Sequence, residues 1–253
     1  MFRAMDKFNS AGVEIAFESW GEGPAILLIH GFASNRFVNW RDTGWVKTLT
    51  EAGFRAIALD NRGHGESEKL YEPARYVLPE MAEDARRLLD HLAIGRAHVM
   101  GYSMGARIAA FLAIGHPARI GRLVLGGLAG NMIRGLGNGP EIAAALEADD
   151  ARSVANGEAR AFRIFAEQTK SDRLALAACM KAGRTKIGPE ALARIAAPTL
   201  VVAGELDGIA GDVGELVAAI PGARGLTLAR RNHMNAVGDR EFKAAVVAFL
   251  AEA

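Results

Sequence analysis

A serine between two glycines is the residue of this chain that most clearly points to chemistry. The stretch "HVMGYSMGARIAAFLAIGHP", residues 98–117, places Ser103 between Gly101 and Gly105, after an apolar run and before an alanine-rich helical pattern. A serine on a sharp strand-to-helix turn adopts strained backbone angles, and small neighbours let the strand and the helix approach each other. The helix start adds the positive end of its dipole and a free backbone N–H just after the serine. The spacing indicates a candidate nucleophile, while glycine and serine are also common at turns that have no catalytic role.

A serine hydroxyl is a poor nucleophile near neutral pH and needs a base. Three of the six histidines are poorly placed for that task. His116 lies about 20 Å from Ser103 along the predicted helix, and His98 lies about 16 Å away on the same strand. His91 falls near the end of the preceding helix, where we expect it on the surface.

The remaining histidines follow predicted strands. Distance alone does not exclude His30 and His64, which sit in loops after earlier strands. His233, in "RRNHMNAV" after the last strand, also lies on a predicted loop at the carboxyl edge of the sheet, and only it fits the chain order serine, acid, histidine. We therefore predict that His233 is the base, and a solvated loop histidine is the alternative.

An acid that orients the base should lie on a strand-end loop between these two residues. The stretch "PTLVVAGELDGIAG" supplies Glu205 and Asp207 just beyond a strand, and Asp212 follows. Asp207 is preferred, because three residues past the glycine the side chain reaches over the sheet edge. Glu205 and Asp212 are the alternatives. The turn after the preceding strand, "LGGLAGN", carries no acid.

Acyl transfer also requires donors for the oxyanion. "LLIHGFASN" ends a buried strand with His-Gly and a turn, from which a second backbone N–H can reach a reacting carbonyl oxygen. We assign the backbone N–H groups of Phe32 and Met104 to this role. A plain strand-ending turn is the alternative interpretation of His30 and Gly31.

Strand-like and helical patterns alternate along the chain, which predicts an α/β fold: a mostly parallel twisted sheet with helices on both faces. Strands are expected at residues 13–20, 25–30, 54–60, 97–102, 121–127, 198–204 and 224–230, and helices around 46–52, 79–92, 104–113, 213–220 and 241–251. Residues 128–190 carry no convincing strand, only a Gly-rich lead-in and three short helical patterns. We expect this insertion to form a small helical cap over the carboxyl edge, where open α/β sheets bind ligands. Residues 1–127 and 191–253 would then form the core, and a helical layer added for stability is the alternative for 128–190.

Composition narrows the class of protein. Half of the 253 residues are hydrophobic and 23% are charged, with 30 basic against 29 acidic residues and a net charge of +1. This balance argues against a nucleic-acid partner. The single cysteine, Cys179, allows neither an intrachain disulfide nor a cysteine zinc cluster, so we expect no metal and no cofactor. The first residues lack the apolar core of a signal peptide, and no stretch is long enough to span a bilayer, which predicts a cytoplasmic protein.

Taken in order, five motifs make the chain similar to the α/β-hydrolase family: "HGFASN", "LDNRGHGES", "GYSMG", "GELD" and "NHMNAV". The resemblance covers nearly the full length and implies the α/β-hydrolase fold. In such proteins "RGHGES" shapes the sheet edge, so the resemblance implies that His64 fixes a loop and is not catalytic.

The family resemblance implies an acyl-enzyme route: His233 takes the Ser103 proton, Asp207 holds the imidazole, and water releases the acid. The expected function is a carboxylesterase-like serine hydrolase acting on a small-molecule ester, with the apolar residues of the cap favouring an apolar group. Lactonase, C–C bond hydrolase and perhydrolase activities use the same residues and stay open, as does a slow-turnover ligand-binding module. Haloalkane dehalogenases and epoxide hydrolases of this fold use an aspartate nucleophile, and epoxide hydrolases place tyrosines in the cap. Here position 103 is serine, and the three tyrosines at 71, 76 and 102 precede the insertion.

Overall fold

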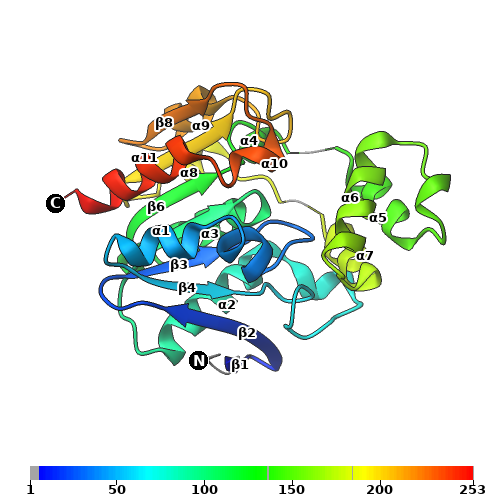
Figure 1. Cartoon of the computed structure of the whole chain (residues 1–253), viewed down its shortest axis with the longest axis horizontal. Helices are drawn as coiled ribbons and strands as arrows, with labels where there is room; N and C mark the ends of the chain where they lie inside the picture. The colour runs from blue at the N-terminus through cyan, green and yellow to red at the C-terminus, as the bar shows by residue number, and fades with distance from the viewer. Residues whose placement is uncertain (1–5, 136, 184, 253) are drawn as a thin grey trace.

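An eight-stranded sheet forms the centre of the molecule (Figure 1). The computed structural model describes residues 6–135, 137–183 and 185–252. The strands are β1 (Asp6–Ser10), β2 (Val13–Trp20), β3 (Ala25–Ile29), β4 (Arg55–Leu59), β5 (Ala97–Tyr102), β6 (Ile120–Gly126), β7 (Thr199–Gly204) and β8 (Arg224–Leu228). Their order across the sheet is β1-β2-β4-β3-β5-β6-β7-β8. The β1–β2 and β2–β4 pairs are antiparallel and all the others are parallel, so the carboxyl ends of β3 to β8 meet along one edge.

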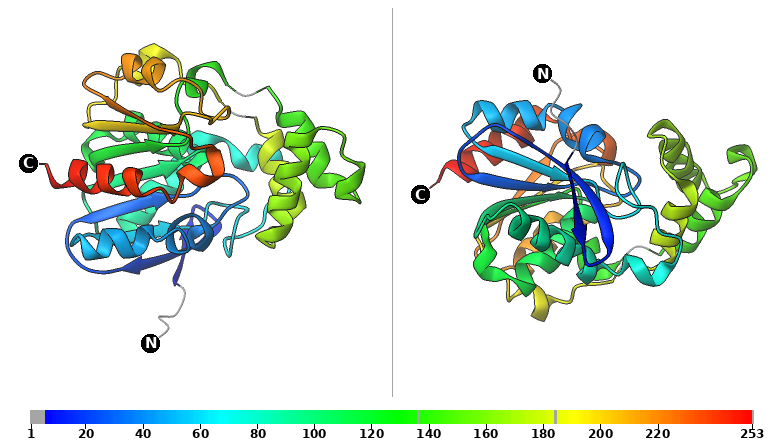
Figure 2. Two further views of the ribbon diagram at one scale, coloured as in Figure 1. Left: turned by 45° about the horizontal axis from the view of Figure 1, so that its top comes forward. Right: turned by 90° about the horizontal axis from the view of Figure 1, so that it is seen from below.

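Two apolar layers enclose the sheet, as the period of two along a strand requires. In β3, Leu27 and Ile29 belong to one buried cluster and Ile26 and Leu28 belong to the other. Such a strand is apolar on both faces, which explains its continuous hydrophobic sequence. Figure 2 shows helices on both sides of the sheet.

The helices are distributed between the two faces. The core helices are α1 (Trp45–Glu51), α2 (Leu78–His91), α3 (Met104–Gly115), α9 (Val213–Ala219), α10 (His233–Ala236) and α11 (Arg240–Ala251). The first cluster receives buried residues of α2, α3 and α9, and the second receives those of α1, α10 and α11. This arrangement confirms the predicted fold class, a mostly parallel sheet covered by helices.

The chain between β6 and β7 is helical in the described residues. It contains α4 (Asn131–Arg134), α5 (Gly139–Glu147), α6 (Gly157–Gln168), α7 (Arg173–Lys181) and α8 (Pro189–Leu192). In Figure 1, α5, α6 and α7 form a lobe beside the core, whereas α4 and α8 lie on the core. We refer to α5, α6 and α7 as the cap helices. A hydrogen bond from Thr169 Oγ1 to the Ala33 carbonyl, 3.0 Å long, joins the end of α6 to the loop after β3.

Several elements differ from the sequence expectations, and the described part of the insertion holds five α-helices where three short helical patterns were expected. The strand β1, the π-helical turn Phe37–Arg41 and the four-residue helix α10 were not among the expected elements. The prediction that His233 lies on a loop is wrong in detail, because His233 is the first residue of α10. Among the described residues, no helix is both long enough and apolar enough to cross a membrane.

Candidate active site

The backbone at Ser103 is strained in the way that a nucleophile turn requires. Ser103 has φ 55° and ψ −116° between the end of β5 and the start of α3. A Cβ on Gly101 would lie 2.1 Å from the Gly105 carbonyl oxygen, and a Cβ on Gly105 would lie 1.9 Å from the Ile29 oxygen. Both contacts involve backbone atoms, so no side chain could move aside. The two glycines are needed here because strand and helix cross at backbone contact.

Ser103, His233 and Asp207 form one hydrogen-bonded chain. Ser103 Oγ lies 3.0 Å from His233 Nε2, and His233 Nδ1 lies 2.8 and 3.0 Å from the two carboxylate oxygens of Asp207. A carboxylate only accepts hydrogen bonds, so Nδ1 carries the proton and donates. In the neutral imidazole, Nε2 is then the acceptor for the serine hydroxyl. The side chain of Asp207 is fully buried and that of His233 is 14% exposed.

The loops after β7 and β8 hold these two residues in place. Asp207 Oδ1 also accepts the backbone N–H groups of Ile209 and Ala210, both at 3.0 Å. The side chain of Asn232 caps α10, and the Asn235 side chain accepts from the Asn232 backbone in return. These contacts fix the carboxylate on the loop after β7 and the imidazole at the start of α10.

The alternative acids have other partners. Glu205 is exposed and accepts the Arg230 backbone N–H at 2.8 Å, and Asp212 caps α9 by accepting the Glu215 N–H. The structure therefore brings Asp207, and neither alternative, to the imidazole. His98 and His116 lie away from Ser103: His98 packs on Phe54, and His116 pairs with Glu83.

The loop after β3 is held by a set of buried hydrogen bonds. The Asn61 backbone N–H donates to His30 Nε2 at 2.9 Å, so His30 Nδ1 carries the proton and donates to the Gly31 carbonyl. Asn39 Oδ1 accepts the Gly31 N–H at 3.0 Å. Burial, the largest cause, lowers the pKa of His30 below its ordinary value, so the ring stays neutral. His30 and Asn39 therefore position the turn that carries Phe32, and His64 donates to the Arg62 carbonyl as a loop residue.

Phe32 and Met104, the residues assigned to the oxyanion, line the same pocket as Ser103. Met104 is the first residue of α3, where the backbone N–H has no acceptor within the helix. Phe32 lies two residues beyond His30, and its ring packs on Phe162 of α6 with 5.9 Å between the ring centroids. Both residues thus line the pocket beside the serine, Phe32 from the loop after β3 and Met104 from the start of α3.

A contact of Tyr102 with His233 was not part of the sequence prediction. The Tyr102 hydroxyl donates to the His233 backbone carbonyl at 2.6 Å, and the two rings pack with their centroids 5.4 Å apart. Gly126 and Gly127 leave room for the ring, since a Cβ on either would lie within 3.0 Å of it. Burial raises the pKa of the Tyr102 hydroxyl, so it remains a donor. Nothing in the sequence spacing links position 102 to position 233.

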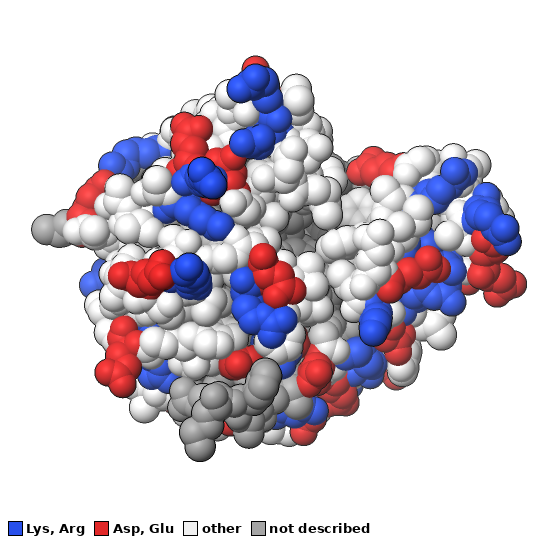
Figure 3. Space-filling model, in the orientation of Figure 1, with Lys and Arg blue, Asp and Glu red and all other residues white. Residues whose placement is uncertain are grey.

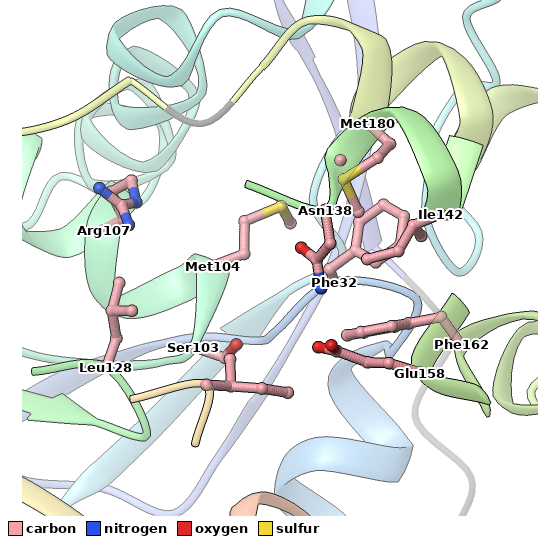
Figure 4. Close-up of a pocket in the computed structure, with 12 residues that line it drawn as sticks. Phe32, Ser103, Met104, Arg107, Leu128, Asn138, Ile142, Glu158, Phe162 and Met180 are labelled. Atoms are coloured by element: carbon pink, nitrogen blue, oxygen red, sulfur yellow. The ribbon is translucent and has the colours of Figure 1, made fainter. Parts of the chain in front are cut away.

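The pocket in front of Ser103 is apolar with a few polar groups (Figure 4). Its lining residues from the core and the cap are Phe32, Ser103, Met104, Arg107, Leu128, Asn138, Gly139, Ile142, Glu158, Phe162, Met180 and Ile209. Figure 3 shows that the molecular surface is hollowed between the cap lobe and the core. Within the described ranges, no group of three or more His, Cys, Asp or Glu residues could hold a metal ion.

Comparison with known proteins decides the family. Residues 24–175 match the model of the alpha/beta hydrolase fold. The chain belongs to the α/β-hydrolase family. The solved structure of a hydrolase from Pseudomonas aeruginosa is 31% identical and covers 98% of both chains, with a TM-score of 0.81. An enol-lactonase from Burkholderia xenovorans is 25% identical over 98% of this α/β-hydrolase chain and 100% of its own, with a TM-score of 0.80.

Curated relatives match a shorter part of this α/β-hydrolase. Epoxide hydrolase 3 from Siraitia grosvenorii is 34% identical over 116 residues, which are 46% of this chain and 36% of that protein. A non-heme chloroperoxidase from Kitasatospora aureofaciens is 36% identical over 94 residues, 37% of this chain and 32% of its own length. The aligned stretch thus spans about a third of these relatives.

Proposed function

We propose that this α/β-hydrolase is a serine hydrolase that cleaves carboxylic esters through an acyl-enzyme. The observation that carries the proposal is the hydrogen-bonded chain of Ser103, His233 and Asp207, with 3.0 Å between Ser103 Oγ and His233 Nε2. Nucleophile, base and orienting acid in this geometry are what acyl transfer requires.

The reaction follows from the contacts. His233 Nε2 takes the hydroxyl proton as Ser103 Oγ attacks the ester carbonyl, and the imidazolium is stabilised by the buried carboxylate of Asp207. The N–H groups of Phe32 and Met104 donate to the oxyanion. His233 then protonates the leaving alcohol, and a water activated by the same imidazole releases the acid.

Epoxide opening is less well supported, although epoxide hydrolases are among the relatives. Epoxide hydrolases of this fold use an aspartate nucleophile, whereas this chain has Ser103 at that position. The hydroxyls of the three tyrosines are also engaged elsewhere: Tyr71 donates to Asp172, Tyr76 to the Leu70 carbonyl and Tyr102 to the His233 carbonyl.

The size of the pocket favours a small ester. The cavity beside Ser103 has a volume of about 40 Å³, whereas sites for drug-sized ligands measure about 300–1,000 Å³. Lactones are cyclic esters and would follow the same route, and the similarity to an enol-lactonase structure favours including them in a substrate panel.

Labelling and turnover test the proposal together. A fluorophosphonate probe should label Ser103 in the folded protein, as peptide mapping would show. Ser103→Ala and His233→Ala should each lower turnover of a short-chain nitrophenyl ester by at least ~10³-fold, and Asp207→Asn by about 10³- to 10⁴-fold. Thermal unfolding monitors the fold of each variant.

Glu205→Gln is the matched control, because it neutralises a carboxylate on the same loop. We expect it to keep turnover within about threefold, since an exposed carboxylate away from the imidazole contributes little. An unlabelled Ser103 would exclude the enzyme, and loss of activity in Glu205→Gln but not in Asp207→Asn would move the acid to Glu205.

A further inference from the structure

One carboxylate of the cap helices faces the proposed nucleophile and has no ion-pair partner among the described residues. Glu158 lies in the first turn of α6 and lines the pocket in front of Ser103. Figure 4 shows the Glu158 carboxylate directed into the space beside the Ser103 hydroxyl. In the part of the chain that the structure describes, no Lys, Arg or His forms an ion pair with Glu158. Among the described lining residues, Glu158 thus carries the one carboxylate, in a pocket that is mostly apolar.

The other groups around this carboxylate also favour a positive ligand. The rings of Phe32 and Phe162 pack edge to face and line the same pocket as Glu158, and aromatic faces attract cations. The Asn138 side chain lines the same pocket and is oriented toward the same space (Figure 4). Arg107, the one positively charged residue among the lining residues, has its guanidinium bound to the carbonyls of Asn131, Met132 and Thr185. It therefore joins the chain before the cap helices to the chain after them.

We propose that Glu158 selects esters that carry a cationic group, such as a quaternary ammonium, on the side of the substrate that faces the cap. This inference rests on the proposed esterase function of Ser103 and names its substrate class. The carboxylate attracts the cation, Phe32 and Phe162 contact its methyl groups, and the ester carbonyl reaches Ser103. The same charge disfavours substrates that carry a carboxylate on that side, and it repels the acid released by deacylation.

Two acetate esters of equal size test the selection. The cationic probe is 2-(trimethylammonio)ethyl acetate, and 3,3-dimethylbutyl acetate is its neutral isostere. For the wild-type protein we expect kcat/KM to be about two- to fivefold higher for the cationic ester, the range given by an exposed charge pair. The preference should fall as salt is raised from about 0.05 to 0.5 M, because the pair is screened.

Glu158→Gln should reduce the preference to near unity. Glu190→Gln is the matched control, since Glu190 is also an exposed first-turn glutamate, on α8, and does not line the pocket. It should leave both the preference and the turnover unchanged. Circular dichroism on heating reports the fold of each variant.

The outcomes separate the two proposals. Equal hydrolysis of both esters by the wild type, or an unchanged preference in Glu158→Gln, overturns the role of Glu158 and leaves the esterase intact. If neither ester is cleaved and the fluorophosphonate does not label Ser103, the esterase proposal fails and the substrate class fails with it.

Discussion

A methyl group on Gly105 should separate the proposed nucleophile from its base. In Gly105→Ala the new Cβ would lie 1.9 Å from the Ile29 carbonyl oxygen and 2.7 Å from that of His30. Real Cβ atoms essentially never approach closer than 3.0 Å, so β3 and α3 must move apart by about 1.1 Å at this point. Both clashing atoms are backbone, so a change of rotamer cannot relieve the contact.

The size of the effect follows from that displacement. The hydrogen bond between Ser103 Oγ and His233 Nε2 is 3.0 Å long. An increase of about 1 Å in the distance between these two atoms would break the hydrogen bond. A misplacement of about 1 Å lowers enzymatic rates by roughly 10²-fold. Overpacking costs about 1–3 kcal/mol, against about 1 kcal/mol gained by placing alanine in a helix. We therefore expect a net loss of stability near 2 kcal/mol, since the overlap is with fixed backbone.

Three measurements test these expectations. Ester turnover reports the rate, fluorophosphonate labelling reports the reactivity of Ser103, and urea unfolding reports the stability. Gly115→Ala is the matched control: Gly115 ends the same helix, and a Cβ there would meet nothing within 4 Å. It should retain activity and gain up to about 1 kcal/mol. If Gly105→Ala labels within twofold of the wild-type rate and unfolds at the same urea concentration, the close approach of β3 and α3 does not position Ser103.

Two further predictions concern Tyr102 and His30. Tyr102→Phe removes the hydroxyl that donates to the His233 carbonyl at 2.6 Å but keeps the ring; we expect kcat to fall roughly tenfold with a stability loss of about 1 kcal/mol, and unchanged kinetics would contradict a positioning role. Burial lowers the pKa of His30, so below the ordinary value of 6.5 the unfolded chain binds a proton that the folded chain does not. Stability should therefore decrease as the pH falls below 6.5, by up to about 1.4 kcal/mol per unit for this histidine. Urea unfolding from about pH 5 to 7.5 measures how the free energy of unfolding changes with pH, and this slope should be shallower in His30→Gln. Equal slopes in the two proteins would show that His30 does not cause the pH dependence.

Strands with a continuous apolar sequence could be predicted, and those without one could not. The expected strand at 25–30 is β3, because a buried parallel strand is apolar on both faces. β1, "DKFNS", contributes one large apolar residue, Phe8, to the core and depends on its antiparallel pairing with β2. The helix α10 is only four residues long and relies on the side chain of Asn232, a tertiary detail that no periodicity carries.

The spatial proximity of Ser103, Asp207 and His233 could be anticipated because each follows a strand of one parallel sheet. Ser103 follows β5, Asp207 follows β7 and His233 follows β8. Parallel strands in one sheet present their carboxyl ends at the same edge, so chain order and strand order together limit where the side chains can meet. The position of Glu158 has no such basis, since no spacing in the sequence relates a helix of the insertion to the strand ends of the core.

The proposed catalysis and the proposed selection therefore depend on different parts of the fold, which meet at the loop after β3. The sheet fixes the proposed nucleophile and base, whereas α6 supplies Glu158 and Phe162 to the pocket. The same helix contacts the loop after β3, through the rings of Phe162 and Phe32 and the hydrogen bond from Thr169 to Ala33. Because that loop carries the amide assigned to the oxyanion, a shift of α6 would change both the shape of the pocket and the donor geometry. Substitutions that move the cap helices should thus alter kcat as well as KM, whereas removal of the Glu158 charge alone acts on the choice between cationic and neutral esters.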